Sequence, residues 1–550
     1  MKLRDFQETA VNNTLAAFED NQSALIVLAT GCGKTVIAAH IADRYKNFGR
    51  ILLVAHREEL IFQGQRTLVN ITGGQSEIEM ADSRASITGM FGGSDIVVST
   101  IQTQIAGSNG GRMTRFNPRE FSLLIVDEAH HATAASYRKV IDYYRTGNPE
   151  LRVLGLTATP DRTDEEALGQ VFESVPFEYD IADGIADGWL VPVQQNSIAV
   201  DGLDFSAVRT TAGELNAKDL AAVLEFEENL HEMTTPILDL CGDDTSLIFT
   251  VSVAQAERMA EILNRHKPGS AEYICGTTPK DVRREILAKY DDGDIQYLCN
   301  VGIATEGFDC PRVRNIIMGR PTKSRALYAQ CLGRGTRPLP SIVDGLDDAA
   351  SRRQAIAESA KPDMMVLDFV GNAGRHKLIH PADVLGGKYS DDIVELANRN
   401  AEQRDGPVDI TSELVQAERE WERRKRKEQE AQARKNLRGK STYKFAKVDP
   451  FDVFHIVPCR EPQWHKGRQP TMKQLECLEK RNIPIPDGLT FAHASQLIDT
   501  MIKRGRADLC TFKQAKLVEK FGYDASEMGF KDASALIDKI AKNGWKRPRP

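Results

Sequence analysis

The sequence predicts an α/β protein with two parallel sheets, followed by a charged helical segment and a small helical domain. Short apolar runs suited to buried strands alternate with helix-favouring segments as far as Val370. The runs begin at Ala24, Arg50, Asp95, Phe121 and Leu151, and a second set begins at Thr245, Tyr297 and Asp363. Polar residues collect where the runs end, which is the edge at which parallel sheets bind their ligands.

Length and composition describe a protein of several domains. The 550 residues are 41% hydrophobic and 27% charged with a net charge of −7, so a nucleic-acid-binding surface would have to be local. The nine cysteines contain no C-x-x-C pair, which indicates neither a zinc ribbon nor a disulfide framework and favours a reducing compartment. No run approaches the ~18 apolar residues of a membrane span, and the first residues do not resemble a signal peptide. We therefore expect a cytoplasmic protein.

A candidate phosphate-binding loop follows the first apolar run. Its residues are Thr30, Gly31, Cys32, Gly33, Lys34 and Thr35, and a helix is expected directly after it, over 36–45. A strand, a glycine turn and a helix N-terminus form an anion cradle, because backbone N–H groups and the helix dipole both attract phosphate. In such a cradle Lys34 reaches the β- and γ-phosphates and the Thr35 hydroxyl binds Mg²⁺. The loop is a variant, since Leu28 stands where the full pattern has glycine.

Two adjacent carboxylates end the apolar run that begins at Phe121. At the end of a strand the chain turns, so that Asp127 and Glu128 can both face one site. Asp127 would hold the Mg²⁺ that Thr35 also touches, and Glu128 would orient or deprotonate the attacking water. The loop and the carboxylates together predict a nucleotide hydrolase that uses ATP and Mg²⁺.

A second set of elements follows a connector rich in glycine, over 181–192. Between 193 and 240 we expect one strand, 193–200, and polar helical stretches. Further on, Arg334 and Arg337 lie three residues apart on one face of a helical or turn segment. A guanidinium that enters from a separate domain can neutralise charge on the γ-phosphate, as an arginine finger does.

The order of these motifs resembles superfamily 2 helicases. The motifs are Ala-Thr-Gly-Cys-Gly-Lys-Thr, Ala-His-Arg-Glu-Glu-Leu, Ser-Thr-Ile-Gln-Thr, Asp-Glu-Ala-His and Leu-Thr-Ala-Thr-Pro. They are similar to the DEAH-box branch that includes type III restriction motor subunits and RadD-like bacterial and phage proteins. The resemblance implies two tandem RecA-like domains that share one ATP site.

The resemblance also implies roles for individual residues. The Gln-x-x-Gly-Arg-x-x-Arg motif of the superfamily matches Gln330, Arg334 and Arg337, the expected catalytic group of the second domain. Adenine would be recognised by Gln7, whose amide can read its Hoogsteen edge, and by Arg4, while Gly307 and Asp309 would contact the nucleotide. The nucleic-acid backbone would be contacted by Arg57, Ser99, Thr100, Gln102, Thr250 and Thr305. Thr157 and Thr159 would couple hydrolysis to domain movement.

The end of the chain contains a charged run and an internal repeat. The run over 413–440 favours a long exposed helix, which suits either phosphate tracking or a solvated spacer. The residues Thr-Met-Lys-Gln at 471–474 return as Thr-Phe-Lys-Gln at 511–514, and Ala-Ser-Gln-Leu-Ile-Asp at 494–499 returns as Ala-Ser-Ala-Leu-Ile-Asp at 533–538. Each unit should form a helix, a turn and a helix. The repeat would bind nucleic acid or dock a protein partner.

Four domains are therefore expected: 1–180 with the ATP-binding motifs, 181–375 with the arginines, a charged linker over 376–460 and the repeats over 461–550. The function expected is an ATP-dependent helicase or translocase on nucleic acid, DNA in preference to RNA. Three alternatives stay open: a duplex translocase that separates no strands, an ATP-gated scaffold for a partner nuclease, and an RNA helicase.

Overall fold

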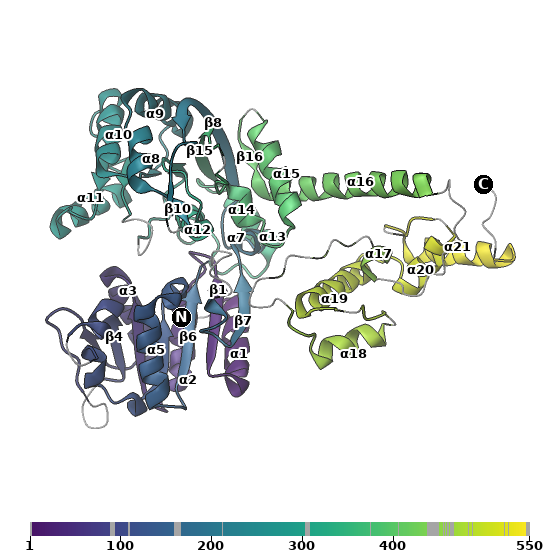
Figure 1. Ribbon diagram of the computed structural model, residues 1–550, viewed down its shortest axis with the longest axis horizontal. Helices are drawn as coiled ribbons and strands as arrows, with labels where there is room; N and C mark the ends of the chain where they lie inside the picture. Colours follow the sequence, from purple (N-terminus) through teal and green to yellow (C-terminus); the bar gives the residue numbers. More distant parts are fainter. Residues whose placement is uncertain are drawn as a thin grey trace. The chain divides into compact units, whose positions relative to one another are not determined.

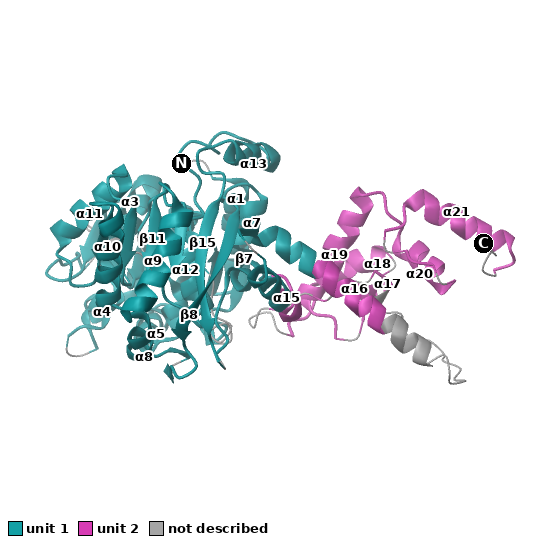
Figure 2. Cartoon of the chain, turned by 90° about the horizontal axis from the view of Figure 1, so that it is seen from above, with its two compact units in different colours: residues 1–387, 395–417 teal, residues 388–394, 418–550 magenta. Residues whose placement is uncertain are grey.

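The computed structural model divides into two compact units. It describes residues 3–87, 94–107, 110–158, 167–211, 213–302, 308–374, 376–404, 406–436, 450–454, 456, 458, 461, 467–481, 483–486, 488–521, 523–525 and 527–545. Unit 1 comprises residues 1–387 and 395–417, and unit 2 comprises residues 388–394 and 418–550 (Figure 2). Unit 1 holds two seven-stranded sheets, and unit 2 is helical over its described residues.

The first sheet is parallel throughout and has the order β3-β4-β2-β5-β6-β1-β7. Figure 1 labels β4, β6, β1 and β7 in this sheet. Its strands are β1 (Ser23–Leu28), β2 (Arg50–Ala55), β3 (Ser76–Glu79), β4 (Ile96–Thr100), β5 (Phe121–Val126), β6 (Arg152–Thr157) and β7 (Ser174–Tyr179). Every residue of β1, β2, β4 and β5 is buried, as expected for strands that are covered on both faces. All five runs predicted for this domain are confirmed as strands.

The helices of the first domain pack around this sheet. They are α1 (Asp5–Asp20), α2 (Lys34–Tyr45), α3 (Glu58–Thr72), α4 (Ile101–Ile105), α5 (Ala135–Gly147) and α7 (Ile181–Ala186). In α1 the buried side chains Phe6, Ala10, Val11, Thr14 and Phe18 recur at helical spacing. This apolar stripe explains why the segment after Arg4 forms a helix against the sheet.

The second sheet has the order β12-β13-β11-β14-β15-β8-β16, and all its pairs are parallel except β16 with β8. Its strands are β8 (Val193–Asp204), β11 (Ser246–Phe249), β12 (Ala271–Ile274), β13 (Tyr297–Asn300), β14 (Asn315–Met318), β15 (Met364–Asn372) and β16 (Val408–Asp409). The helices around it are α8 (Ala217–Leu224), α9 (Glu227–Cys241), α10 (Val253–His266), α11 (Lys280–Asp292), α12 (Arg325–Gly333), α13 (Ala349–Ala357), α14 (Pro381–Leu385), α15 (Asp391–Glu402) and the start of α16 (Ile410–Asn436). The predicted class of two tandem parallel-sheet domains is confirmed.

Two local predictions for this domain are wrong. The region 193–240 holds not one strand but three, because β9 (Thr210–Thr211) and β10 (Glu214–Leu215) form a small hairpin. The sheet also extends beyond the runs that end at Val370, because the two-residue strand β16 pairs with β8 at its edge. Two-residue strands carry no periodic pattern. They are fixed instead by distant contacts, such as the Glu214 carboxylate that accepts the backbone N–H groups of Lys323 and Ser324.

The repeats form the predicted pairs of helices, α18 (Met472–Lys480) with α19 (Phe491–Arg506) and α20 (Phe512–Lys520) with α21 (Phe530–Lys542). Thr471 caps α18, and Gln474 completes the capping box while its Nε2 donates to Ser495 Oγ of α19 at 2.8 Å. Gln514 donates to Ser534 in the second unit at the same distance. The recurring Thr, Gln and Ser residues therefore cap one helix and tie it to the next.

The core of the repeats extends upstream of residue 461. Phe451, Val453 and Phe454, at the short helix α17 (Pro450–Val453), are buried in the same apolar cluster as Leu478 and Val518. These residues lie in the segment that the sequence assigns to the linker, whose boundaries stay a prediction. None of the described helices is long and apolar enough to cross a membrane.

Candidate active site

The phosphate-loop residues form a tight turn between β1 and α2. Gly31 and Gly33 have φ values of +86° and +88°, and Gly33 is the N-cap of α2. A Cβ atom at Gly33 would lie 2.5 Å from Gln7 Nε2, so only glycine fits both the backbone conformation and the space. Helix α2 therefore begins at Lys34. A phosphate bound in the loop would meet the free N–H groups at the N-terminus of this helix.

Strand order brings the carboxylates to this loop. Strands β5, β6 and β1 are neighbours, so their carboxyl ends place Asp127 and Glu128, Thr157 and the phosphate loop side by side. Lys34 Nζ lies 3.0 Å from Glu128 Oε1, and both side chains are largely buried. Glu128 has a φ of +47°, a conformation that is uncommon for a residue with a Cβ and that turns the chain sharply after β5.

The Glu128 carboxyl group is ionised in this setting. Burial alone would raise its pKa, but the charge of Lys34 and the contact with His130 outweigh burial and lower the pKa below its usual range. His130 Nδ1 lies 3.4 Å from Glu128 Oε2 and 3.4 Å from Thr157 Oγ1. A carboxylate held in this way can accept a proton or a hydrogen bond from water once Lys34 turns to a phosphate.

The second domain closes the site from the other side. A cavity of about 300 Å³ lies between the two sheets of unit 1. Its lining from the first domain includes Thr30, Gly31, Gly33, Lys34, Thr35, Asp127 and Glu128, and its lining from the second includes Phe308, Asp309, Gly333, Arg334 and Arg337. A Cβ atom at Gly333 would lie 2.5 Å from Thr30 Cβ, which shows how closely the end of α12 approaches the phosphate loop.

Both candidate arginines already have partners at this cavity. Arg337 forms an ion pair with Asp309, and Arg334 donates to the backbone carbonyl of Phe308. Gln330 is buried within α12 and is not among the residues that line the cavity. Gly307, Thr305 and Thr159 lie outside the described residues, so their predicted roles stay predictions.

The residues predicted to recognise adenine, Gln7 and Arg4, lie near the phosphate loop. Gln7 Nε2 donates to the Cys32 carbonyl oxygen at 2.9 Å, and Gln7 Oε1 accepts the Arg4 backbone N–H. The Arg4 guanidinium lies 4.1 Å from the centre of the Trp189 ring, which the Arg352 guanidinium approaches at the same distance. Burial raises the pKa of the Cys32 thiol to about 12, so that this thiol is neutral. Cys32 serves the site through its backbone.

Of the six residues predicted to contact nucleic acid, the five that the structure describes differ widely in exposure. Gln102 is exposed, and its Nε2 lies 3.2 Å from His56 Nδ1. Arg57 Nη1 donates to the Gly302 carbonyl oxygen at 2.9 Å, which links the two domains. Ser99 and Thr250 have at most 1% of their surface exposed and donate to Glu79 O and Asn300 O respectively, and Thr100 caps α4. Contact with a strand by Ser99 or Thr250 would need local rearrangement, and all these assignments stay predictions.

Three histidines form a chain that the sequence did not single out. The rings of His130 and His131 are 4.1 Å apart, and those of His131 and His56 are 5.1 Å apart. Because His56 contacts Gln102 and His130 contacts Glu128, the chain links the exposed Gln102 of α4 to the carboxylate. In the sequence, His56 and His130 stand within two of the quoted motifs, but no role was predicted for them.

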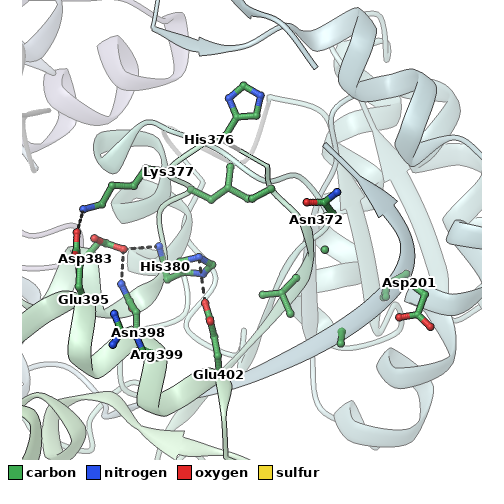
Figure 3. A pocket seen from close by; sticks show the side chains of 16 residues that line it. Asp201, Asn372, His376, Lys377, His380, Asp383, Glu395, Asn398, Arg399 and Glu402 are labelled. Carbon is green, nitrogen blue, oxygen red and sulfur yellow. Dashed lines mark hydrogen bonds and ion pairs between the residues drawn. The ribbon is translucent and has the colours of Figure 1, made fainter. Parts of the chain in front are cut away.

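A second cavity, of about 820 Å³, lies beside β8 and β15 of the second domain (Figure 3). His380 lines it, and its Nδ1 lies 2.7 Å from Asp368 Oδ2, which also accepts the Tyr328 hydroxyl at 3.3 Å. Burial lowers the pKa of His380, but the Asp368 carboxylate and other acidic neighbours outweigh it and raise the pKa to about 9. The network connects α12 to the segment that follows β15.

Two family models match the regions that build the first cavity. Residues 1–162 match "Type III restriction enzyme, res subunit", and residues 232–338 match "Helicase conserved C-terminal domain". Both matches agree with the resemblance to superfamily 2 helicases. The resemblance that the motifs predicted, including its restriction-enzyme branch, is confirmed.

Individual relatives of this chain include proteins from yeast and bacteria. The Saccharomyces cerevisiae protein "Putative ATP-dependent helicase IRC3" is 30% identical over 358 residues, which cover 61% of this chain and 49% of that protein. The Escherichia coli "Type I restriction enzyme EcoAI endonuclease subunit" is 26% identical over 367 residues, which cover 61% and 44% of the two chains. A solved "HsdR subunit" fragment from Vibrio vulnificus YJ016 is 19% identical with a TM-score of 0.49, over 68% of this chain and 70% of that chain. The chain thus spans about half the length of these two sequence relatives.

Proposed function

We propose that this protein is an ATPase that depends on nucleic acid and converts ATP hydrolysis into movement along it. One observation carries the proposal: residues from both sheets line the same cavity, with Lys34 and Glu128 on one side and Arg334 and Arg337 on the other. A site divided between two domains couples the state of the nucleotide to the distance between them. That coupling is what a motor requires.

The chain's own residues suit hydrolysis of a γ-phosphate. Lys34 exchanges Glu128 for the phosphates, and the free carboxylate of Glu128 then orients the attacking water and accepts its proton. Arg337 exchanges Asp309 for the phosphate, and Arg334 stays beside Arg337. Guanidinium charge thus reaches the phosphate from the second domain. Gly31 and Gly33 let the backbone approach the phosphates closely.

The site also fits Mg²⁺. Thr35 and Asp127 both line the cavity, and they offer a hydroxyl and a carboxylate oxygen on the side where the phosphates would lie. Mg²⁺ in nucleotide sites is held by one or two such oxygens together with phosphates and water, and among the described residues no cluster of three or more candidate ligands occurs. When bound, the ion would neutralise charge on the phosphates.

DNA is the proposed track, in preference to RNA. The support is the family match to restriction-enzyme subunits and the basic segments at the end of the chain. The exposed Gln102 and the histidine chain that leads from it to Glu128 would connect a nucleic acid bound at Gln102 with the ATP site. Strand separation, duplex translocation and scaffolding of a partner nuclease stay open as alternatives within this proposal.

Steady-state phosphate release tests the proposal. The wild type should hydrolyse ATP faster when duplex, forked or single-stranded DNA is added than when single-stranded RNA is added. Lys34→Ala and Glu128→Gln should each lower the rate at least ~10²-fold, or about 2.7 kcal/mol of barrier. Glu128→Gln should still bind ATP, because it keeps Lys34 and the loop.

Two exposed residues provide matched controls. Lys218→Ala and Glu150→Gln make the same chemical changes away from the cavity and should leave the rate unchanged. A wild type without ATPase activity on any nucleic acid would contradict the motor proposal. Near-normal rates in Lys34→Ala or Glu128→Gln would contradict the site.

A further inference from the structure

Lys361 holds together two segments of the proposed ATP site. Its Nζ donates to the Arg337 carbonyl oxygen at 2.7 Å and to the Pro311 carbonyl oxygen at 2.8 Å. Lys361 lies between α13 and β15, and only 2% of its surface is exposed. We propose that Lys361 is a positioning residue that keeps the backbone of Arg337 in place while its guanidinium moves to the nucleotide. The inference rests on the proposed function.

The two carbonyls belong to segments that meet at the cavity. Pro311 follows Asp309, which lines the cavity and pairs with Arg337, and Arg337 follows the end of α12. The segments are therefore joined twice, once by the Asp309–Arg337 side-chain pair and once by Lys361 through backbone. Only the first link has to open when Arg337 turns to a phosphate. Lys361 is then the remaining link. It keeps the backbone of Arg337 in place while the Arg337 side chain moves.

A buried amine is suited to such a link. Carbonyl oxygens accept hydrogen bonds but cannot bond to each other, so a donor must lie between them, and lysine reaches both from a third segment. Burial, together with the positive charges of Arg337 and Arg314, lowers the pKa of Lys361 to about 7, although Cys310 and Asp309 act to raise it. Arg314 is itself engaged with Asp244 and Asp363 at 3.0 and 3.1 Å. The contact is thus a backbone clamp rather than an ion pair.

The decisive measurement is a double-mutant cycle between Lys361 and Arg337. Lys361→Met should lower kcat by about tenfold while the KM for ATP changes much less, because the arginine acts after the nucleotide has bound. In the Arg337→Ala background, Lys361→Met should cause no further loss of kcat, since a clamp acts only through the arginine it holds. Lys289→Met is the control, because Lys289 is exposed and pairs with Glu285 on α11.

Each outcome has a separate meaning. A wild-type kcat in Lys361→Met overturns the inference. An equal loss of kcat in the wild-type and Arg337→Ala backgrounds also overturns it, because that result describes general damage to the fold. If Lys361→Met does not fold, Lys361→Gln keeps an N–H donor and goes through the same cycle. An inactive wild type would instead contradict the proposed function and leave no kcat to compare.

Discussion

Gly333→Ala tests the closed contact between the two parallel-sheet domains. The new methyl group would lie 2.5 Å from Thr30 Cβ, 3.1 Å from its Oγ1 and 3.2 Å from its Cγ2, where ordinary contacts begin at 3.4 Å. The end of α12 and the phosphate loop must therefore separate by about 1 Å, a displacement that can cost about 10²-fold in rate, or about 2.7 kcal/mol. We expect that loss in kcat, with ATP binding much less affected.

The same substitution should not destabilise the second domain. Gly333 is the last residue of α12, and alanine is favoured over glycine inside a helix by up to about 1 kcal/mol. A thermal melt should therefore show an unchanged or raised midpoint, while single-turnover hydrolysis is slow. This combination distinguishes blocked closure from unfolding.

Gly276→Ala is the matched control, since a Cβ there meets no atom within 4 Å. It should leave both the hydrolysis rate and the midpoint unchanged. A Gly333→Ala protein that hydrolyses ATP at the wild-type rate would show that the two domains do not approach each other in this way during catalysis. The roles given to Arg334 and Arg337 would then lose their geometric basis.

Three further results are expected. Arg337→Lys should lose as much hydrolysis as Arg337→Ala, because lysine keeps the charge but not the planar fork; retained turnover would indicate a surface role. His380 has a pKa raised to about 9 from 6.5, so its stabilisation is present below pH 6.5 and lost as the pH rises through about 9; melts of His380→Gln should lack that decline. Ending the chain before Pro450 should keep basal ATPase, and if the tail binds phosphates it should flatten the salt dependence of DNA affinity, whereas equal slopes would favour partner docking.

The sequence predicted the parts of the site that are local in the chain. A phosphate loop needs one strand, two glycines and one helix start, and all lie within residues 23–45, so the pattern and the structure coincide there. The adjacent carboxylates after β5 were equally local. The phosphate loop and the carboxylates face one cavity because of the strand order β5-β6-β1. The motifs imply this order only through the resemblance to a known family.

Contacts between distant segments could not be read from any pattern. Lys361 is 24 residues from Arg337 and 50 from Pro311, and nothing in its neighbourhood marks it as part of a site. Burial is also a property of the whole fold: Ser99 and Thr250 have the residue type and position of backbone contacts, yet their hydroxyls bond to main-chain carbonyls inside the protein. A polar residue at a strand end is as easily a structural hydrogen bond as a ligand contact.

The pairing of the proposed catalytic groups suggests how the proposed ATPase would limit futile hydrolysis. Lys34 is bound to Glu128 within the first domain, and Arg337 is bound to Asp309 within the second. Each pair withholds one charge that the γ-phosphate requires, and each opens only when a stronger anion competes for its cation. Because the phosphates reach Lys34 within one domain but reach Arg337 only when the domains are close, we infer that the second exchange depends on closure. A nucleic acid that binds across both domains would favour closure, and hydrolysis would then follow engagement of the track.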